Sequence, residues 1–256
     1  MRRSDPPSLL SVVNLSKRFG GLVALDDVSI DAKKGEITLL IGPNGSGKTT
    51  MINTVSGSLK PDSGRVLFDG RDVTGLRPHE MYKLGLTRTF QIPAVFQSMT
   101  VCQNVMTAFR DQKGEGLLGA IRKTWAEQEE RFFAEAMDIL RLVSLEDSCY
   151  RLASTLSGGQ MKLLELAKAL ASKPKMILMD EPIAGVLPSL SHDIFTHIVK
   201  LKEDLGLTFL VVEHRLDIAL DYVDYVYAMH QGRVIASGSP KQVMEDGSVV
   251  EAYLGG

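Results

Sequence analysis

Short apolar runs recur along the first third of the chain and are separated by turns. Pairs such as Lys34-Gly35 and Asp69-Gly70 bound these runs, and glycine tolerates the backbone angles of tight turns. The runs are rich in β-forming residues and span Leu9–Asn14, Val28–Ala32, Glu36–Ile41 and Arg65–Phe68. The pattern predicts several short β-strands in this third of the protein.

The spacing of apolar residues becomes helical between residues 101 and 143. In the stretch 126–143 the apolar positions recur at intervals of three and four, at Phe133, Ala136, Leu140 and Val143. This spacing places them on one face of a helix, so we expect a solvated helix with one buried stripe. Glycines at positions 114, 116 and 119 predict a flexible break before it.

Longer apolar runs follow residue 174. Met176–Met179 and Leu207–Val212 are almost continuously apolar, as in parallel strands covered on both faces. Tyr225–Met229 and Arg233–Ala236 flank His230-Gln-Gly232 and predict a hairpin. Strands and helices therefore alternate in this part of the chain, as in an α/β fold.

A glycine-rich loop separates the predicted strand Glu36–Ile41 from the helix-compatible run Thr50–Val55. It fits the pattern GxxxxGK[S/T] without a gap, through Gly42, Pro43, Asn44, Gly45, Ser46, Gly47, Lys48 and Thr49. Glycines let consecutive N–H groups turn inward around a polyphosphate, and the start of a helix near Lys48 adds positive potential. The loop predicts a nucleoside triphosphate site, with Lys48 on the β/γ oxygens and the Thr49 hydroxyl on Mg²⁺.

Two adjacent carboxylates follow the apolar run Met176–Met179. In open α/β sheets ligands bind at the carboxyl ends of strands, which is where Asp180 and Glu181 stand. Successive strand residues point in opposite directions, so the two acids can serve different purposes. We expect Asp180 to orient Mg²⁺ and Glu181 to polarise an attacking water.

A second glycine pair follows a hydroxyl residue in the sequence Leu-Ser-Gly-Gly-Gln at 156–160. Apolar residues at Leu163, Ala167 and Leu170 have helical spacing, so the pair stands at the start of a helix, where free backbone donors favour an anion. In isolation, a serine N-cap with a flexible loop explains the same residues.

Taken in order, these motifs resemble those of the ATP-binding subunits of ABC transporters, and the resemblance covers nearly the whole chain. It includes a glutamine loop in Thr89-Phe90-Gln91 and a switch histidine in Val212-Glu213-His214. Phe19 stands where the family places an aromatic residue that stacks on adenine, although Val23 and Leu25 could supply similar apolar contact.

The resemblance implies an α/β fold: a P-loop NTPase (RecA-like) core with an N-terminal antiparallel β subdomain and a helical subdomain. A single ABC ATPase domain is expected over residues 8–256. Residues 8–90 and 170–256 would form the β subdomain and the core, 91–169 the helical subdomain with the signature motif, and 1–7 a flexible tail.

The resemblance also implies a site shared between two ATPase subunits, which binds ATP or ADP with Mg²⁺. The nucleotide contacts expected within the chain are Phe19, Gly42, Pro43, Asn44, Gly45, Ser46, Gly47, Lys48, Thr49 and Thr50. Those expected from the signature motif of the second subunit are Ser157, Gly158, Gly159 and Gln160. The expected catalytic residues are Glu181, His214, Gln91 and Lys48, and the expected Mg²⁺ ligands are Thr49, Gln91 and Asp180.

Composition narrows the functional classes to which the protein can belong. The 256 residues carry 29 Lys and Arg against 31 Asp and Glu, so no overall charge indicates nucleic-acid binding. No apolar run approaches the ~20 residues that span a bilayer, and no signal peptide is evident, so we expect a cytoplasmic protein. The family resemblance implies that it is peripheral on the inner face of the cell membrane. Cys102 and Cys149 lack metal-ligand spacing and are expected to be isolated thiols.

Within the family, the long segment between Gln91 and the signature motif and the ending Val249–Leu254 resemble subunits that power branched-chain amino-acid uptake. The implied partners are a second ATPase subunit, identical or homologous, two transmembrane permeases and, indirectly, an extracytoplasmic solute-binding protein. Lipopolysaccharide-export and urea or amide-uptake ATPases are alternatives, and a soluble ABC ATPase without a membrane partner is a further one.

One position departs from the family pattern. Most members carry Asp or Asn in the loop that crosses the dimer interface, where this chain has Leu187. Leucine cannot make the polar contact, so backbone groups or Ser189 are the alternatives for communication between the two sites.

Overall fold

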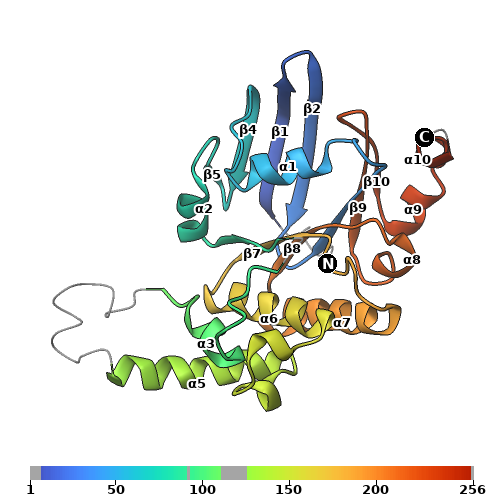
Figure 1. Cartoon of the computed structure of the whole chain (residues 1–256). Coiled ribbons are helices and arrows are strands. Elements are labelled where there is room, and N and C mark those ends of the chain that lie inside the picture. Colours follow the sequence, from blue (N-terminus) through green and yellow to red (C-terminus); the bar gives the residue numbers. More distant parts are fainter. Residues whose placement is uncertain (1–6, 91–92, 111–125, 255–256) are drawn as a thin grey trace, which may run out of the picture.

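Two β-sheets and a layer of helices make up the described part of the chain. The computed structural model describes residues 7–90, 93–110 and 126–254 (Figure 1). The predicted tail residues 1–6, the predicted glycine break at 114–119 and the predicted site residue Gln91 lie outside the described residues.

The strands form one antiparallel and one largely parallel sheet. They are β1 (Ser8–Phe19), β2 (Leu22–Lys33), β3 (Ile37–Ile41), β4 (Ser63–Phe68), β5 (Arg71–Asp72), β6 (Leu86–Arg88), β7 (Met176–Asp180), β8 (Thr208–Val212), β9 (Tyr225–His230) and β10 (Arg233–Gly238). The four-stranded sheet has the order β2-β1-β4-β5 with antiparallel pairs. The six-stranded sheet has the order β10-β9-β3-β8-β7-β6, with β10 antiparallel to β9 and the other pairs parallel. The expected α/β fold class is confirmed.

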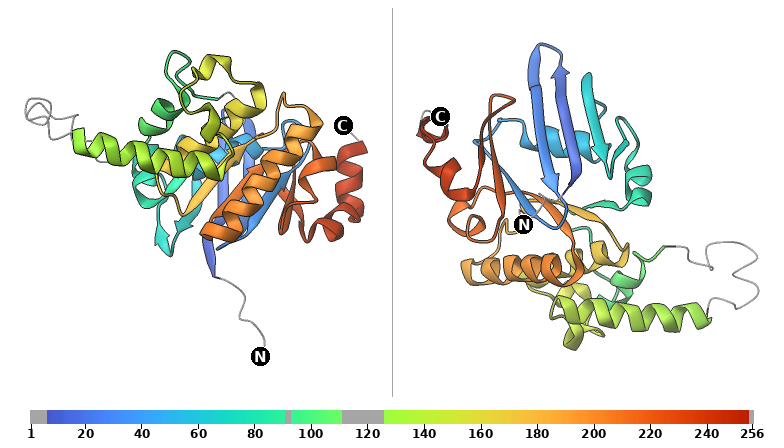
Figure 2. Two further views of the ribbon diagram at one scale, coloured as in Figure 1. Left: turned by 90° about the horizontal axis from the view of Figure 1, so that it is seen from below. Right: turned by 180° about the vertical axis from the view of Figure 1, so that it is seen from behind.

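The helices lie on both sides of the six-stranded sheet. They are α1 (Lys48–Val55), α2 (Pro78–Leu84), α3 (Val101–Met106), α5 (Ala126–Leu142), α6 (Gly158–Ala171), α7 (Pro188–Leu205), α8 (Leu216–Ala219), α9 (Pro240–Met244) and α10 (Gly247–Leu254), with 3₁₀ turns η2 (Glu146–Ser148) and η3 (Ala153–Thr155). The views in Figure 2 show α5 and α7 on the same side of this sheet. Among the described residues, no helix combines the length and apolar character that a membrane crossing requires.

Alternating side chains on the central strands build two separate cores. One face packs with α1 and the four-stranded sheet, through Leu40, Leu178, Leu210 and Val212. The other face packs with α6 and α7, through Leu39, Ile41, Ile177, Met179, Phe209 and Val211. Because strand side chains alternate, a continuous apolar run covers both faces, as the sequence predicted. Helices α1 and α6 therefore lie on opposite faces of the same sheet.

The buried stripe of α5 is wider than the sequence predicted. In α5 the residues Ala136, Leu140 and Val143 are buried as predicted, but Phe132 is buried more completely than Phe133. Phe132 stacks on Phe109 of the neighbouring chain segment, with the ring centroids 4.6 Å apart. Phe133 is partly buried against the same core and also stacks on the exposed Tyr150, so the buried stripe includes Phe132 in addition to the predicted residues.

The sequence analysis predicted that Cys102 and Cys149 are isolated thiols. Both are free cysteines, but they contact each other. The N–H of Cys102 donates to the carbonyl oxygen of Cys149 at 3.0 Å, and both thiols are buried and free. Burial, together with the hydrogen bond and charge of the Cys149 thiol, raises the pKa of Cys102 to about 12. The backbone bond between the two residues holds α3 against the turn that follows η2.

Substitution of Phe209 tests the core that lies between the six-stranded sheet and the two helices α6 and α7. Its side chain is fully buried in β8, so Phe209→Ala should lower the free energy of unfolding by about 3–5 kcal/mol through the cavity it leaves. Phe96→Ala is the matched control, because that side chain is 53% exposed. Urea unfolding should show a loss below about 1 kcal/mol for the control, and equal losses would contradict this core.

Candidate functional site

The glycine-rich loop connects β3 to α1 and takes a conformation that requires glycine. Gly42 and Gly47 have φ angles of 149° and 106°. A Cβ on Gly42 would lie 2.2 Å from the carbonyl oxygen of Met229, and one on Gly47 would lie 2.5 Å from that of Ala24. The loop is therefore seated closely against β2 and β9, which fixes the start of α1 at the carboxyl end of β3.

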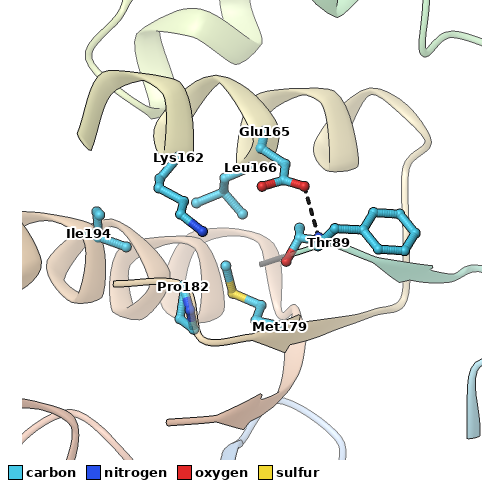
Figure 3. Close-up of a pocket in the computed structure, with 8 residues that line it drawn as sticks. Thr89, Lys162, Glu165, Leu166, Met179, Pro182 and Ile194 are labelled. Carbon is cyan, nitrogen blue, oxygen red and sulfur yellow. Dashed lines mark hydrogen bonds between the residues drawn. The ribbon is translucent and has the colours of Figure 1, made fainter. Parts of the chain in front are cut away.

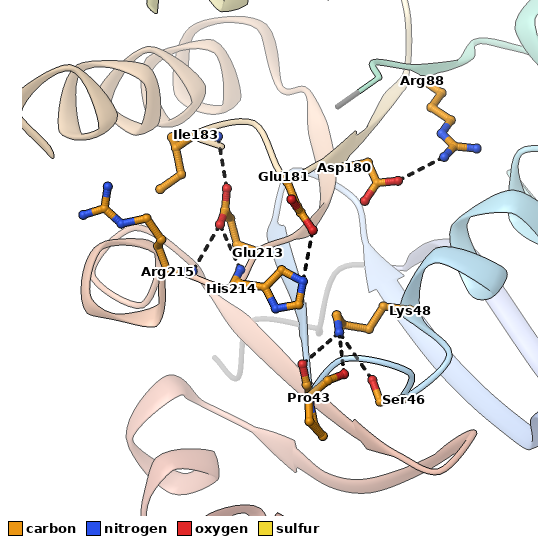
Figure 4. A network of polar contacts seen from close by, with 11 residues as sticks. Pro43, Ser46, Lys48, Arg88, Asp180, Glu181, Ile183, Glu213, His214 and Arg215 are labelled. Atoms are coloured by element: carbon orange, nitrogen blue, oxygen red, sulfur yellow. Dashed lines mark hydrogen bonds and ion pairs between the residues drawn. The ribbon is translucent and has the colours of Figure 1, made fainter. Parts of the chain in front are cut away.

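Lys48, the first residue of α1, turns back over the loop. Its ammonium group donates to the carbonyl oxygens of Gly42 and Pro43 at 2.8 and 2.9 Å, and to Ser46 Oγ at 3.4 Å (Figure 4). Burial lowers the pKa of Lys48, and the nearby carboxylates of Glu181 and Asp180 act in the opposite direction. The cation thus lies between a loop of backbone groups and two acids.

Asp180 and Glu181 diverge where β7 ends. Asp180 keeps strand geometry and forms an ion pair with Arg88 of β6, with 3.1 Å between Nη2 and Oδ2. Glu181 has a φ angle of 50°, although its N–H still donates to Val212 at 2.9 Å. This positive φ turns the carboxylate toward His214, whose Nε2 lies 3.0 Å from Glu181 Oε1 (Figure 4). A non-glycine residue in this region costs about 1–3 kcal/mol and is often found at functional sites.

Arg88 contributes to the site although the sequence analysis did not identify it. Besides Asp180, its guanidinium donates to Asn53 Oδ1 at 2.6 Å and to Ser56 Oγ at 3.3 Å. Arg88 therefore links β6, β7 and the end of α1 on one side of Asp180. No local motif marks it, because its partners are 35 and 92 positions away in the sequence.

Glu213, which stands in the switch segment, is a buried support for the loop that follows Glu181. Its carboxylate accepts N–H bonds from Ile183 at 3.0 Å, from His214 at 2.9 Å and from Arg215 at 3.2 Å (Figure 4). Burial raises the pKa of Glu213, and these three N–H donors oppose that rise. Glu213 fixes the segments that carry Glu181 and His214 relative to each other.

The remaining predicted residues lie elsewhere. Phe19 ends β1 on the four-stranded sheet, is 46% exposed and has the Lys17 ammonium 5.6 Å from its ring centroid. Ser157 caps α6 on the opposite face of the six-stranded sheet from α1: its Oγ accepts from the N–H of Gln160 at 3.3 Å, and the Gln160 side chain accepts from the N–H of Ser157 at 3.1 Å. The predicted helix start is confirmed.

The arrangement divides the predicted site into two parts within one chain. The phosphate loop, Asp180, Glu181 and His214 converge at one edge of the six-stranded sheet. Ser157 and Gly158 are exposed at the start of a helix that packs on the other core. The N–H of Ser157 is bonded to Gln160, and the N–H of Gly158 in the first turn of the helix is available to a second molecule.

Comparisons with known proteins identify the family of this chain. The sequence profile of the family described as ABC transporter matches residues 25–184. A probable branched-chain amino acid transport ATP-binding protein LivG from Methanocaldococcus jannaschii is 47% identical over 255 residues, which is 98% of this chain and 99% of the relative.

Solved structures give the same result. The ADP conformation of MJ1267, an ATP-binding cassette of an ABC transporter, is 46% identical with a TM-score of 0.85, over 98% of this chain and 100% of that one. A dimeric post-hydrolysis cassette, MJ0796 bound to ADP and Pi, is 26% identical with a TM-score of 0.73, over 90% of this chain and 98% of the other. With a family match over more than half of its length and relatives that span it almost completely, this chain belongs to the ABC transporter family.

Proposed function

We propose that this chain is the ATP-hydrolysing subunit of an importer of branched-chain, hydrophobic amino acids. The observation that carries the ATPase activity is the convergence of Lys48, Asp180, Glu181 and His214 beside the glycine-rich loop. The cargo is inferred from the name and near-complete coverage of the Methanocaldococcus relative. The names of this and further relatives favour branched-chain amino acids over the alternatives of lipopolysaccharide export and urea or amide uptake.

ATP would bind with its phosphates in the loop from Gly42 to Thr50. The loop N–H groups and the start of α1 supply donors and positive potential for the phosphates. Lys48 would exchange its bonds to the Gly42 and Pro43 carbonyls for β- and γ-phosphate oxygens. Phe19, which is exposed at the end of β1, would stack on the adenine.

The oxygen donors near Lys48 suit Mg²⁺. Thr49 follows Lys48 at the start of α1, and Asp180 lies close enough to Lys48 to affect its pKa. In the described part of the chain no three His, Cys, Asp or Glu residues cluster in a way that could hold a metal ion, which suits an ion that takes most of its ligands from phosphate and water. We propose Thr49, Asp180 and Gln91 as its protein ligands; when bound, Mg²⁺ neutralises charge on the transferred phosphoryl group.

Hydrolysis would use Glu181 as the base that orients and deprotonates the water attacking the γ-phosphate. His214 already holds one oxygen of Glu181 at 3.0 Å and would contact the γ-phosphate as well. Glu213 would hold the segments that carry Glu181 and His214 in a fixed relative position, because its carboxylate accepts three backbone N–H bonds from them. Most of the catalysis is then positioning and charge stabilisation.

The second half of the site would come from another subunit. Ser157, Gly158, Gly159 and Gln160 would donate to the γ-phosphate of an ATP bound by the partner. ATP would close the dimer and hydrolysis would release it, because half of the phosphate contacts cross the interface. The dimeric MJ0796 cassette supports this assembly by similarity.

Transport requires contact with permeases, and an exposed apolar surface follows the glutamine loop. Phe90, Phe96 and Met99 are 52%, 53% and 37% exposed. We propose that a helix from one transmembrane permease docks here and that the second permease docks on the second ATPase subunit, which would hold both subunits at the cytoplasmic face of the membrane. A solute-binding protein outside the membrane would act through these permeases.

Glu181→Gln tests the assigned base. The amide keeps the shape of the side chain but cannot take a proton, so Mg-ATP should bind and turnover should fall by about 10²–10⁴-fold. The variant should elute as a dimer from a sizing column with ATP and as a monomer without it. Glu203→Gln, an exposed change on α7, is the control. Wild-type turnover in Glu181→Gln would remove this residue from the role.

To test the cargo, the chain is copurified with its permeases, the complex is reconstituted in lipid vesicles, and the solute-binding protein is added. Leucine, isoleucine or valine should stimulate ATP hydrolysis several-fold, whereas urea should not. Stimulation by urea or by a lipopolysaccharide acceptor instead would reject the proposed cargo while leaving the ATPase assignment intact.

A further inference from the structure

A buried acid lies in the middle of α6 among apolar side chains. Glu165 is only 7% exposed, and its neighbours Leu164 and Leu166 are buried in the core beneath the sheet. Acidic residues are rarely so buried unless they bind specific partners. Glu165 has no role in the nucleotide chemistry described above, so its partners indicate what it does.

The carboxylate of Glu165 accepts hydrogen bonds from backbone N–H groups on either side of residues 91–92. Its Oε1 accepts from the N–H of Phe90 at 2.8 Å, and its carboxylate also accepts from the N–H of Ala94. Figure 3 shows the carboxylate reaching from α6 across a small pocket to this N–H, beside Thr89. One side chain therefore anchors the chain just before and just after residues 91–92.

A second side chain of α6 strengthens this attachment. Lys168, three positions after Glu165, donates to the carbonyl oxygen of Ala94 and lies with its ammonium 5.0 Å from the ring centroid of Phe96. The carboxylate holds the N–H of Ala94 and the lysine holds its C=O. Ala94 is thus attached to α6, while Phe96 is held on α3, because its N–H donates to Asn104 Oδ1 at 2.7 Å and its C=O accepts from Asn104 Nδ2 at 2.9 Å.

The other end of the same helix is the signature motif. Ser157 caps α6 through its bond with Gln160, eight residues before Glu165. At about 1.5 Å per residue, the cap and Glu165 lie about 12 Å apart along a continuous helix. Leu164, Leu166 and Ala167 pack this helix into the core, so it moves as a rigid element.

We propose that Glu165 is a positioning residue that ties the signature helix to the chain on either side of Gln91, so that the two move together. A shift of Ser157 on binding a partner's nucleotide would then pull on Phe90 and Ala94 and on the exposed aromatic surface. This inference rests on the proposed function, because it assumes that the signature motif meets nucleotide in a dimer.

Glu165→Ala removes the acceptor, and Glu165→Gln retains one carbonyl acceptor at the same distance from the helix. With the solute-stimulated complex in vesicles, Glu165→Ala should keep its affinity for ATP within about twofold and lose about three- to tenfold of the solute stimulation. Glu165→Gln should recover part of that loss. Glu203→Ala is the matched control on an exposed helix position.

A second readout does not depend on the cargo. Amide hydrogen exchange is followed at residues 157–160 and at Phe90 and Ala94 of a Lys48→Ala chain, whose own loop is disabled, with and without an ATP-loaded Ser157→Arg chain that presents nucleotide to its signature motif. With Glu165 intact, the partner's ATP should change exchange at both places; with Glu165→Ala added to the Lys48→Ala chain it should change only at 157–160. The coupled response in Glu165→Ala, or a Glu165→Gln response no closer to wild type than that of the alanine variant, would overturn the proposal. Failure of the cargo assignment alone would abolish solute stimulation in wild type and leave this exchange pattern unchanged.

Discussion

The parallel pairing of β3, β7 and β8 is the constraint on which the site depends. These three strands are completely buried and are paired in register, with Leu40 opposite Val212 and Asp180 opposite Val212 on the other side. Because parallel strands end at the same edge, the phosphate loop, the acid pair and the switch histidine emerge side by side. The strand order brings these groups to one edge of the sheet, and the conformation of each loop sets the final position of its side chains.

The same sheet also explains why one chain holds two separated halves. Strand side chains alternate between faces, so α1 packs on one core and α6 on the other. This separation supports the proposal that a nucleotide held at the start of α1 meets the start of α6 of a second molecule. The proposed dimer would then close on ATP and reopen after hydrolysis.

Local sequence patterns predicted the parts whose geometry is local. The glycine pattern, the strand before Asp180 and the capped start of α6 each depend on neighbouring residues, and each was found where it was expected. The residues that the sequence analysis passed over act across the fold. Arg88 reaches Asp180 and Glu165 reaches Phe90 through contacts 92 and 75 positions apart, which no periodicity encodes.

The errors have the same origin. The apolar spacing in α5 identified Phe133, which packs partly against the core, but not Phe132, which stacks on Phe109 and is buried more completely. The contact between Cys102 and Cys149 likewise joins segments that are distant in sequence. Tertiary packing decides between alternatives that local spacing leaves equivalent.

Complementation between two defective variants tests the shared site most directly. Lys48→Ala disables the phosphate loop and Ser157→Arg disables the signature motif, so each protein alone should lack ATP turnover at concentrations where wild type is active. A dimer of one copy of each contains one site with both halves intact. Mixing the two should restore turnover to at most about half of the wild-type rate, since only mixed dimers carry an intact site and each carries one. An inactive mixture, or full activity of Ser157→Arg alone, would contradict the account.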